Sequence, residues 1–255
     1  MTRKNALLYI LAALTLAVSG LSIPYLLRGR IAAPVRSRID QLARAFAKDI
    51  DLARQRNATL ESAQFVDEQM PTAPAFPDRS ALFRASLAAV DPKINGLYCE
   101  FGVAEGESIN FIASLVDKEV HGFDSFEGLP EDWRGDYPKA TFKLAAPPKV
   151  RANVKLHKGW FNETLPPFKK QFRQPLAFMH LDADLYSSTK SVFDILGDRI
   201  VEGTVIQFDE FFNYPGWKSG EYRAFKEFCD AGGVEVRYIG YCPRDEQVAV
   251  KVVRR

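Results

Sequence analysis

Acidic residues follow two apolar runs in the second half of this 255-residue sequence. The runs cover residues 176–181 and 203–208, and apolar runs of this length are typical of strands buried on both faces of a parallel sheet. The four acids that follow them are Asp182, Asp184, Asp209 and Glu210. If the two strands are neighbours, the acids share one sheet edge, and hard oxygen ligands of this kind suit Mg²⁺. Carboxylates this close repel one another unless a cation or a raised pKa relieves them.

Acids that follow a strand can instead cap the next helix. For Asp184, capping and metal ligation remain equally open, whereas for Asp182 and Asp209 we expect a chemical function. His180, inside the first apolar run, is expected to be a hydrogen-bonded structural side chain with the option of orienting an acid.

A glycine turn separates a short apolar run from a helical pattern in the middle of the chain. The run 97–101 predicts a strand, Gly102 and Gly106 bracket the turn, and apolar residues follow at helical spacing. Gly102 lets the backbone approach a ligand closely, and the helix start offers free N–H groups. Glu100 lies near the carboxyl end of the strand, where open α/β sheets bind ligands. An acid there suits an ammonium group or hydroxyls and disfavours a pyrophosphate.

Asp124 ends a second predicted strand, 120–123. Its spacing from the glycine turn is that of an acid that holds the two ribose hydroxyls in nucleotide-binding folds. The segment 125–148 is rich in Gly, Pro and aromatic residues and long for a structureless connection, so we expect a lid. Alternating strands and helices, followed by a terminal pair of strands, predict an α/β fold with a mostly parallel sheet and an antiparallel edge.

The overall charge is nearly balanced, with 34 Lys and Arg against 32 Asp and Glu and a formal net charge of +2. This balance argues against a broad nucleic-acid surface, so no nucleic-acid partner is expected. The three cysteines show no metal-binding spacing, and a reducing compartment fits them best.

The N-terminal segment predicts a membrane anchor over residues 1–28, because Ala6–Leu27 is an uncharged run of 22 residues, and about 20 residues span a bilayer. Basic residues are denser after this run, which places the C-terminal part in the cytoplasm as a single-pass membrane protein. A cleaved signal peptide is the alternative. Residues 29–70 predict an amphipathic juxtamembrane helix, with a dimer helix as the minority interpretation. Residues 71–78 predict a proline-rich linker, and residues 79–255 the catalytic domain.

Five motifs occur in order along the predicted catalytic domain. They are Glu-Phe-Gly-x-x-x-Gly, Gly-Phe-Asp-Ser-Phe-Glu-Gly-Leu-Pro, Thr-Leu-Pro, His-x-Asp-x-Asp-Leu-Tyr-x-Ser-Thr and Ile-x-Phe-Asp-Glu. In order and spacing they resemble the TylF/MycF (macrocin O-methyltransferase-like) family of S-adenosylmethionine-dependent methyltransferases. The resemblance covers roughly residue 82 to the C-terminus.

The resemblance implies a Rossmann-like class I methyltransferase fold with a seven-stranded sheet, S-adenosyl-L-methionine as cofactor, and a magnesium ion. Carried over by position, the cofactor-binding residues are Glu100, Gly102, Gly106, Asp124, Ser125 and Phe126. Contact with the adenine is expected after the third predicted strand, through Gly159 or its neighbours His157 and Trp160. The implied metal ligands are Asp182, Asp209 and Glu210, and Asp182 is the implied catalytic base. The family more often has a second Asp where this chain has Glu210.

The sequence therefore predicts a membrane-tethered O-methyltransferase that acts on a sugar or polyol hydroxyl of a small molecule or glycan. A catalytically degenerate scaffold or cofactor-binding module is the alternative. An NAD-type oxidoreductase is less favoured, because Ala104 stands where its motif needs glycine. The acceptor's identity stays open, and so does assembly into a homo-oligomer.

Overall fold

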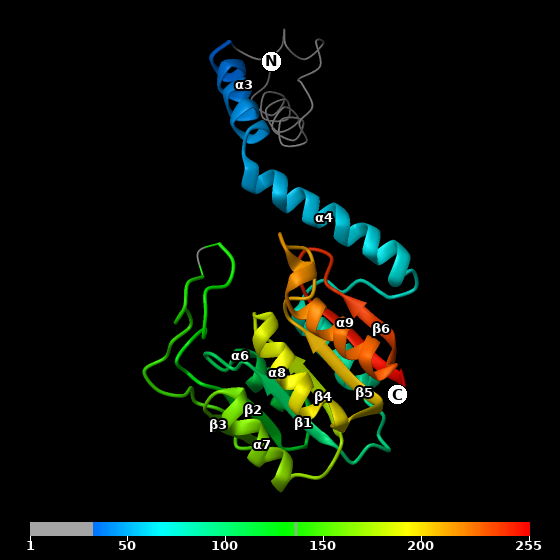
Figure 1. The fold of residues 1–255 in the computed structure, drawn as a ribbon. Coiled ribbons are helices and arrows are strands. Elements are labelled where there is room, and N and C mark those ends of the chain that lie inside the picture. The colour runs from blue at the N-terminus through cyan, green and yellow to red at the C-terminus, as the bar shows by residue number, and fades with distance from the viewer. Residues whose placement is uncertain (1–32, 136) are drawn as a thin grey trace. The chain divides into compact units, whose positions relative to one another are not determined.

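The computed structural model describes residues 33–135 and 137–255, and the chain divides into two compact units at residue 60 (Figure 1). The predicted anchor lies outside the described residues. The predicted juxtamembrane helix is two helices, α3 (Ala33–Ala47) and α4 (Ile50–Gln69). The break has a local cause, because the Asp49 carboxylate accepts hydrogen bonds from the backbone N–H groups of Asp51 and Leu52 and so starts a new helix.

The single-pass membrane location predicted above is corrected by the structure. Among the described residues, no helix combines the length and the apolar character needed to cross a bilayer. The 20-residue helix α4 is long enough, but it carries charged side chains along its length, such as Asp51, Arg54 and Asp67. Burying such charges in hydrocarbon is too unfavourable for a spanning helix.

Residues 61–255 contain one seven-stranded sheet in the order β3-β2-β1-β4-β5-β7-β6. The strands are β1 (Leu97–Phe101), β2 (Val120–Asp124), β3 (Val154–Lys158), β4 (Leu176–Leu181), β5 (Ile200–Phe208), β6 (Glu235–Tyr241) and β7 (Val248–Arg254). Strands β1 to β5 are parallel, and β7 runs antiparallel to both β5 and β6. The predicted α/β fold with an antiparallel edge is confirmed.

Five helices cover the sheet, α5 (Arg79–Ala89), α6 (Glu107–Leu115), α7 (Phe161–Gln171), α8 (Tyr186–Leu196) and α9 (Glu221–Gly232). Helices α5 and α6 lie on one face and α7, α8 and α9 on the other (Figure 1). Phe83 of α5 and Ile109 and Ile112 of α6 pack with Phe178 and Val205 of the central strands in one core cluster. Burial of these apolar faces fixes the carboxyl ends of the strands in space.

The sheet order reverses between β1 and β4, whose chain neighbours β2 and β5 lie on opposite sides. In open α/β sheets a ligand crevice lies outside the carboxyl ends of the strands at such a switch point. The register aligns Glu100 with His180, and His180 with Gln207, so the motifs after β1, β4 and β5 emerge side by side.

The proline-rich stretch 71–78 lies against the outer strand of this sheet. Ala75 forms a parallel bridge with Tyr241 of β6, Phe76 N–H donates to the Tyr241 carbonyl at 2.8 Å, and Tyr241 N–H donates to the Pro74 carbonyl at 3.3 Å. Gly240 makes room for this contact, because a Cβ atom there would lie 2.3 Å from the Phe76 ring.

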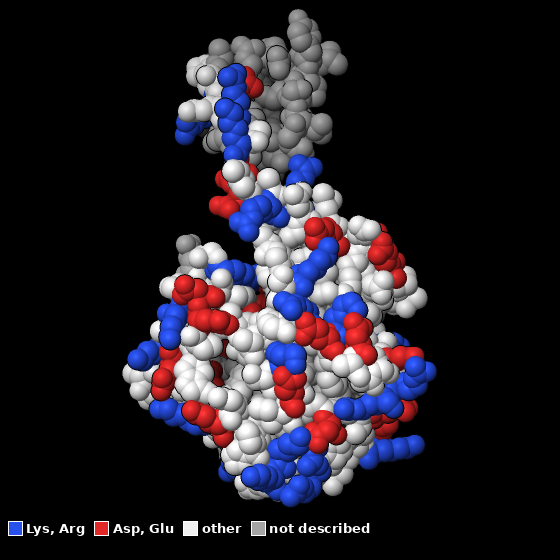
Figure 2. Space-filling view, in the orientation of Figure 1, with Lys and Arg blue, Asp and Glu red and all other residues white. Residues whose placement is uncertain are grey.

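The surface of the larger unit mixes both signs of charge. Figure 2 shows Lys and Arg interspersed with Asp and Glu over the face it draws. Several are pairs one helical turn apart, including Arg223 with Glu227 and Lys226 with Asp230 on α9. Exposed pairs of this kind stabilise a helix only slightly.

Candidate active site

A cavity of about 570 Å³ opens at the carboxyl ends of the strands. Most of the predicted site residues line it, namely Gly102, Asp124, Ser125, Gly159, Asp182, Asp209 and Glu210. The segment 125–148 adds aromatic lining through Trp133, Tyr137 and Phe142. A cavity of this size with convergent polar groups is typical of a small-molecule site.

Glu100, Gly106 and Phe126 are not among the lining residues of the cavity. Glu100 is fully buried and bonds to His180, Gly106 is the left-handed N-cap of α6, and Phe126 packs in the core cluster. Cofactor contact by these three residues stays a prediction, and the structure places them behind the cavity wall.

Gly102 permits a close approach, but the approach is to the protein's own backbone. Its φ of +89° is in the left-handed region, and a Cβ atom would lie 1.7 Å from the Asp182 carbonyl oxygen. The ends of β1 and β4 can therefore meet only if this residue is glycine.

Asp124 braces the glycine turn. Its carboxylate accepts hydrogen bonds from the N–H groups of Val103 and Ala104, each at 2.8 Å, and of Phe126 at 2.6 Å. Ala104 has a φ of +43°, a strained conformation for a residue with a side chain, and the Asp124 bond helps to hold it. A carboxylate has about four acceptor positions, so three donors leave room for about one ligand hydroxyl.

Three acids converge in the cavity. Carboxylate oxygens of Asp182, Asp184 and Glu210 lie within 4.8 Å of one another. Asp184 reaches the cluster in the left-handed conformation, with a φ of +61°, which Asp adopts more readily than most residues with a side chain. This set differs from the predicted one, because Asp184 takes the place of Asp209.

The protonation behaviour of the cluster follows from burial and mutual repulsion. Burial, followed by the charge of Asp209, raises the pKa of Asp184 to about 7 and raises the pKa values of Asp182 and Glu210 well above their usual range. Glu210 Oε2 is buried and has no hydrogen-bond partner among the described residues. Three hard oxygen donors with unrelieved charge fit a divalent cation such as Mg²⁺.

Asp209 faces basic groups instead. Arg79 Nη1 lies 3.2 and 3.3 Å from its two carboxylate oxygens and 3.7 Å from Asp182 Oδ2. Burial opposes ionisation of Asp209, but His180 and Arg79 outweigh it and lower the pKa of this carboxyl. In the sequence, Arg79 is marked only by its place at the start of a predicted helix.

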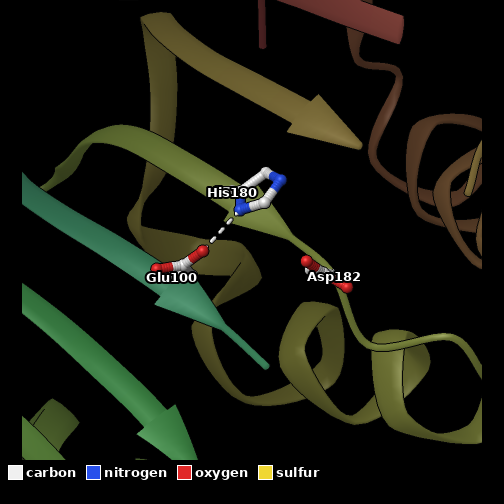
Figure 3. A group of neighbouring side chains, drawn as sticks. All are labelled: Glu100, His180 and Asp182. Atoms are coloured by element: carbon white, nitrogen blue, oxygen red, sulfur yellow. Dashed lines mark hydrogen bonds and ion pairs between the residues drawn. The ribbon is translucent and has the colours of Figure 1, made fainter. Parts of the chain in front are cut away.

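His180 joins Asp209 to Glu100. Figure 3 shows Glu100 and His180 facing each other from neighbouring strands, with Asp182 just beyond the end of β4. His180 Nδ1 lies 2.8 Å from Glu100 Oε1, and Nε2 lies 3.6 Å from Asp209 Oδ1. Burial disfavours a charged imidazole, but these carboxylates prevail and raise the pKa of His180 to about 10. Glu100, His180, Asp209 and Arg79 thus form a chain of alternating charge, called here the charge chain.

Glu221 is a further buried acid that the sequence analysis missed. From the first residue of α9 it accepts hydrogen bonds from Ala183 N–H at 3.2 Å, Thr189 Oγ1 at 3.1 Å and Glu210 N–H at 3.4 Å. It therefore ties the segments after β4 and β5 to each other. An acid in the first turn of a helix is an ordinary feature, so the sequence contained no stronger signal.

Arg134 holds the lid segment to the end of the sheet. Its guanidinium makes two hydrogen bonds to Glu246, at 2.9 and 2.8 Å, and lies 4.1 Å from the ring centres of both Trp133 and Tyr214. This paired and stacked geometry favours Arg over Lys and fixes the aromatic wall of the cavity.

Residues 99–211 match a family model described as a methyltransferase domain. A tetracenomycin-C 4'-O-methyltransferase that acts on a 2,3-dimethoxy-rhamnosyl derivative, from Streptomyces olivaceus, is 31% identical over 147 residues, which are 46% of this chain and 54% of that protein. Demethyldecarbamoylnovobiocin O-methyltransferase from Streptomyces niveus is 28% identical over 135 residues, 45% of this chain and 50% of that protein. The chain thus spans about half the length of these curated relatives.

Two solved structures have a similar fold. The calicheamicin methyltransferase CalS11 superposes with a TM-score of 0.56 at 19% identity, covering 77% of this chain and 91% of that one. The O-methyltransferase NovP superposes with a TM-score of 0.50 at 21% identity, covering 68% and 78%. The protein has a Rossmann-like methyltransferase fold. The matched methyltransferase domain covers residues 99–211 of it, whereas the predicted bounds 79–255 and membership of the TylF/MycF family stay predictions.

Proposed function

We propose that the protein is an S-adenosylmethionine-dependent O-methyltransferase that modifies a sugar or polyol hydroxyl with the help of Mg²⁺. The observation that carries the proposal is the convergence of Asp182, Asp184 and Glu210 in the cavity of a methyltransferase fold. The relatives support it, because both curated proteins are O-methyltransferases.

The cofactor half of the cavity lies at the ends of β1 and β2. Gly102, Asp124, Ser125 and Gly159 line it, and Asp124 is the residue proposed to hold ribose. When bound, S-adenosylmethionine supplies a methyl group already activated by its sulfonium centre. The protein's main contribution is then to position the acceptor oxygen in line with that group.

The acidic cluster defines the acceptor half. Asp182 and Glu210 are proposed metal ligands, and the geometry favours Asp184 over Asp209 as the third. When bound, a magnesium ion supplies Lewis-acid polarisation, which lowers the pKa of a coordinated hydroxyl. Asp182 is the proposed base that accepts the hydroxyl proton, because its carboxylate lies in the acidic cluster that lines the cavity. Glu221 and Gly102 hold the two strand ends that carry these acids.

The direct test is transfer of a labelled methyl group from S-adenosylmethionine to a panel of glycosides and free polyols, with Mg²⁺ or with EDTA. We expect labelled product only in the presence of the cation, together with calorimetric binding of S-adenosylmethionine. Cofactor binding without transfer to any acceptor would instead indicate a cofactor-binding module. Full activity in EDTA would remove the cation from the proposal.

A further inference from the structure

The last turns of α4, residues 61–69, pack on the loop that begins with Asp209 and Glu210. This loop, residues 209–220, connects β5 to α9 and contains only one short helical turn, at Trp217–Ser219. Its conformation is therefore set by what packs against it rather than by a ladder of its own hydrogen bonds. Residues 61–69 are called here the support helix.

An aromatic cluster joins the support helix to the loop. The Phe65 ring lies 6.0 Å from Phe211, 5.5 Å from Trp217 and 5.4 Å from Tyr222, centre to centre. Trp217 is 1% exposed and Phe211 is fully buried. Tilted and edge-to-face aromatic contacts of this kind add specific geometry to the burial of apolar surface. Because Phe211 directly follows Glu210, this packing acts on the backbone next to the acid.

A buried polar contact fixes the loop at a second point. Ser62 Oγ accepts a hydrogen bond from Asn213 N–H at 2.9 Å, and Ser62 is only 4% exposed. Asn213 has a φ of +64°, so this bond holds a backbone conformation that side chains disfavour. The exposed pair of Glu61 with Lys218, at 2.8 Å, adds little by comparison.

The loop needs such support because the acids it presents repel their neighbours. Glu210 lies with Asp182 and Asp184, and the carboxylate oxygens of the three residues are within 4.8 Å of one another. Glu221, the first residue of α9, accepts a hydrogen bond from the Glu210 N–H, and within the loop the Tyr214 hydroxyl donates to the Glu210 carbonyl at 3.5 Å. The Glu246 carbonyl accepts hydrogen bonds from the N–H groups of Phe211 and Phe212, at 3.0 and 3.4 Å. The support helix adds contacts to residues 211–217 from the part of the described chain that precedes the proline-rich stretch.

We propose that Ser62 and Phe65 are positioning residues of the active site, which hold the loop so that Glu210 joins Asp182 and Asp184 around the cation. This inference rests on the proposed function. It also means that the catalytic unit begins before the proline-rich stretch, earlier than the domain start at residue 79 that the sequence predicts.

The test uses full-length Phe65→Ala and Ser62→Ala, with Asp67→Ala as the control, because Asp67 is exposed on the same helix. Hydrogen exchange of peptides covering 209–220 reports on the loop, and calorimetry with MgCl₂ and with S-adenosylmethionine reports on the two half-sites. We expect faster exchange in the loop, and about 10-fold weaker Mg²⁺ binding, as for other residues that orient metal ligands. Cofactor affinity should stay within about 2-fold of wild type, since residues behind the metal ligands act on the metal site alone.

Equal loss of cation and cofactor binding would show a merely structural role and overturn the inference, as would unchanged loop exchange. If Phe65→Ala does not fold, Phe65→Leu and Ser62→Ala carry the same comparison. Wild-type protein that neither binds Mg²⁺ nor transfers a methyl group would refute the proposed function. An active wild type with an equally active, tightly Mg²⁺-binding Phe65→Ala would refute only the positioning role.

Discussion

Two groups of acids lie side by side at the carboxyl ends of β1, β4 and β5, and they differ in what neutralises them. Glu100 and Asp209 alternate with His180 and Arg79 in the charge chain. Asp182, Asp184 and Glu210 form the other group, called here the open cluster. Asp182 lies 3.7 Å from Arg79 and within 4.8 Å of a His180 ring nitrogen, whereas Asp184 and Glu210 form no ion pair among the described residues. Adjacent residues in the sequence, Asp209 and Glu210, belong to different groups.

The difference in neutralisation separates a group of acids that stabilises the site from a group that can take part in the reaction. Buried charges are tolerated when partners of opposite sign and hydrogen bonds replace water. The charge chain provides partners of opposite sign inside the protein, although Glu100 Oε2 and His180 Nε2 have no hydrogen-bond partner among the described residues. The open cluster lacks such an alternation of charge, and burial together with repulsion between carboxylates raises the pKa values of its three acids. Perturbed acids in a cavity are candidates for function, so the open cluster is where we expect a cation and an acceptor.

The largest effect is expected from Asp182→Asn, which keeps the shape of the open cluster but removes the proposed base. General base catalysis contributes about 10²- to 10⁴-fold, so kcat for methyl transfer should fall by at least about 100-fold. Asp117→Asn, an exposed acid after α6, is the matched control. Transfer at the wild-type rate by Asp182→Asn would take this residue out of the mechanism.

A sharper comparison sets Asp184→Asn against Asp209→Asn. Asp184 belongs to the open cluster, so its substitution should weaken Mg²⁺ binding in calorimetry by on the order of 100-fold, the upper end for residues around a metal. Asp209 contacts Arg79 and His180 instead of the open cluster. Its substitution should therefore weaken Mg²⁺ binding by about 10-fold, the lower end of the range for residues around a metal. A larger loss of Mg²⁺ affinity in Asp209→Asn than in Asp184→Asn would make Asp209 a metal ligand, as the sequence predicts. The charge chain and the open cluster would then not differ in function.

Glu100→Gln tests the charge chain from its far end. The amide cannot stabilise a charged imidazole, so the pKa of His180 should fall below its value of about 10. A pH titration of the His180 ring by NMR measures the shift. We expect an accompanying loss of about 10-fold in kcat through misplacement of Asp209. An unchanged His180 titration would show that Glu100 does not carry the counter-charge.

The smallest effect concerns His121, a buried histidine whose neighbouring acid, Glu119 at 3.6 Å, is itself exposed. His121 lies 3.1 Å from His157, and burial, followed by the charge of His157, lowers the pKa of His121 to about 4. The unfolded chain binds the proton at about 6.5, so stability is complete above that pH and is lost as pH falls toward 4. We expect a loss of about 1–2 kcal/mol from this residue, measured by urea unfolding of wild type and His121→Gln. Parallel pH profiles for the two proteins would contradict it.

The sequence was sufficient to predict the sheet and the place of the site. Apolar runs that end in acids identified β4 and β5, and the glycine turn identified β1, because parallel strands bring their carboxyl ends to one edge. Glu100, Asp182 and Asp209 were therefore expected at this edge, and the structure places them there.

The sequence could not predict which acids are paired with basic groups and which form the open cluster, because this depends on side chains from helices distant in the sequence. Arg79 comes from the start of α5 and Glu221 from the start of α9, where a charged residue is unremarkable in the sequence. A strand pattern also gives no information on the left-handed conformation that turns Asp184 into the cavity. The break at Asp49 was missed for a related reason, since the apolar stripe continues across it.

The pairing of Ala75 with Tyr241 has a consequence for handling the protein. An outermost strand with free N–H and C=O groups invites other chains to add to the sheet, and the proline-rich stretch occupies part of that edge of β6. Deleting the residues up to 78 would remove this cover and expose the unpaired backbone groups of β6. Shortened versions that begin there should self-associate, whereas those that keep residues 61–78 should stay dispersed.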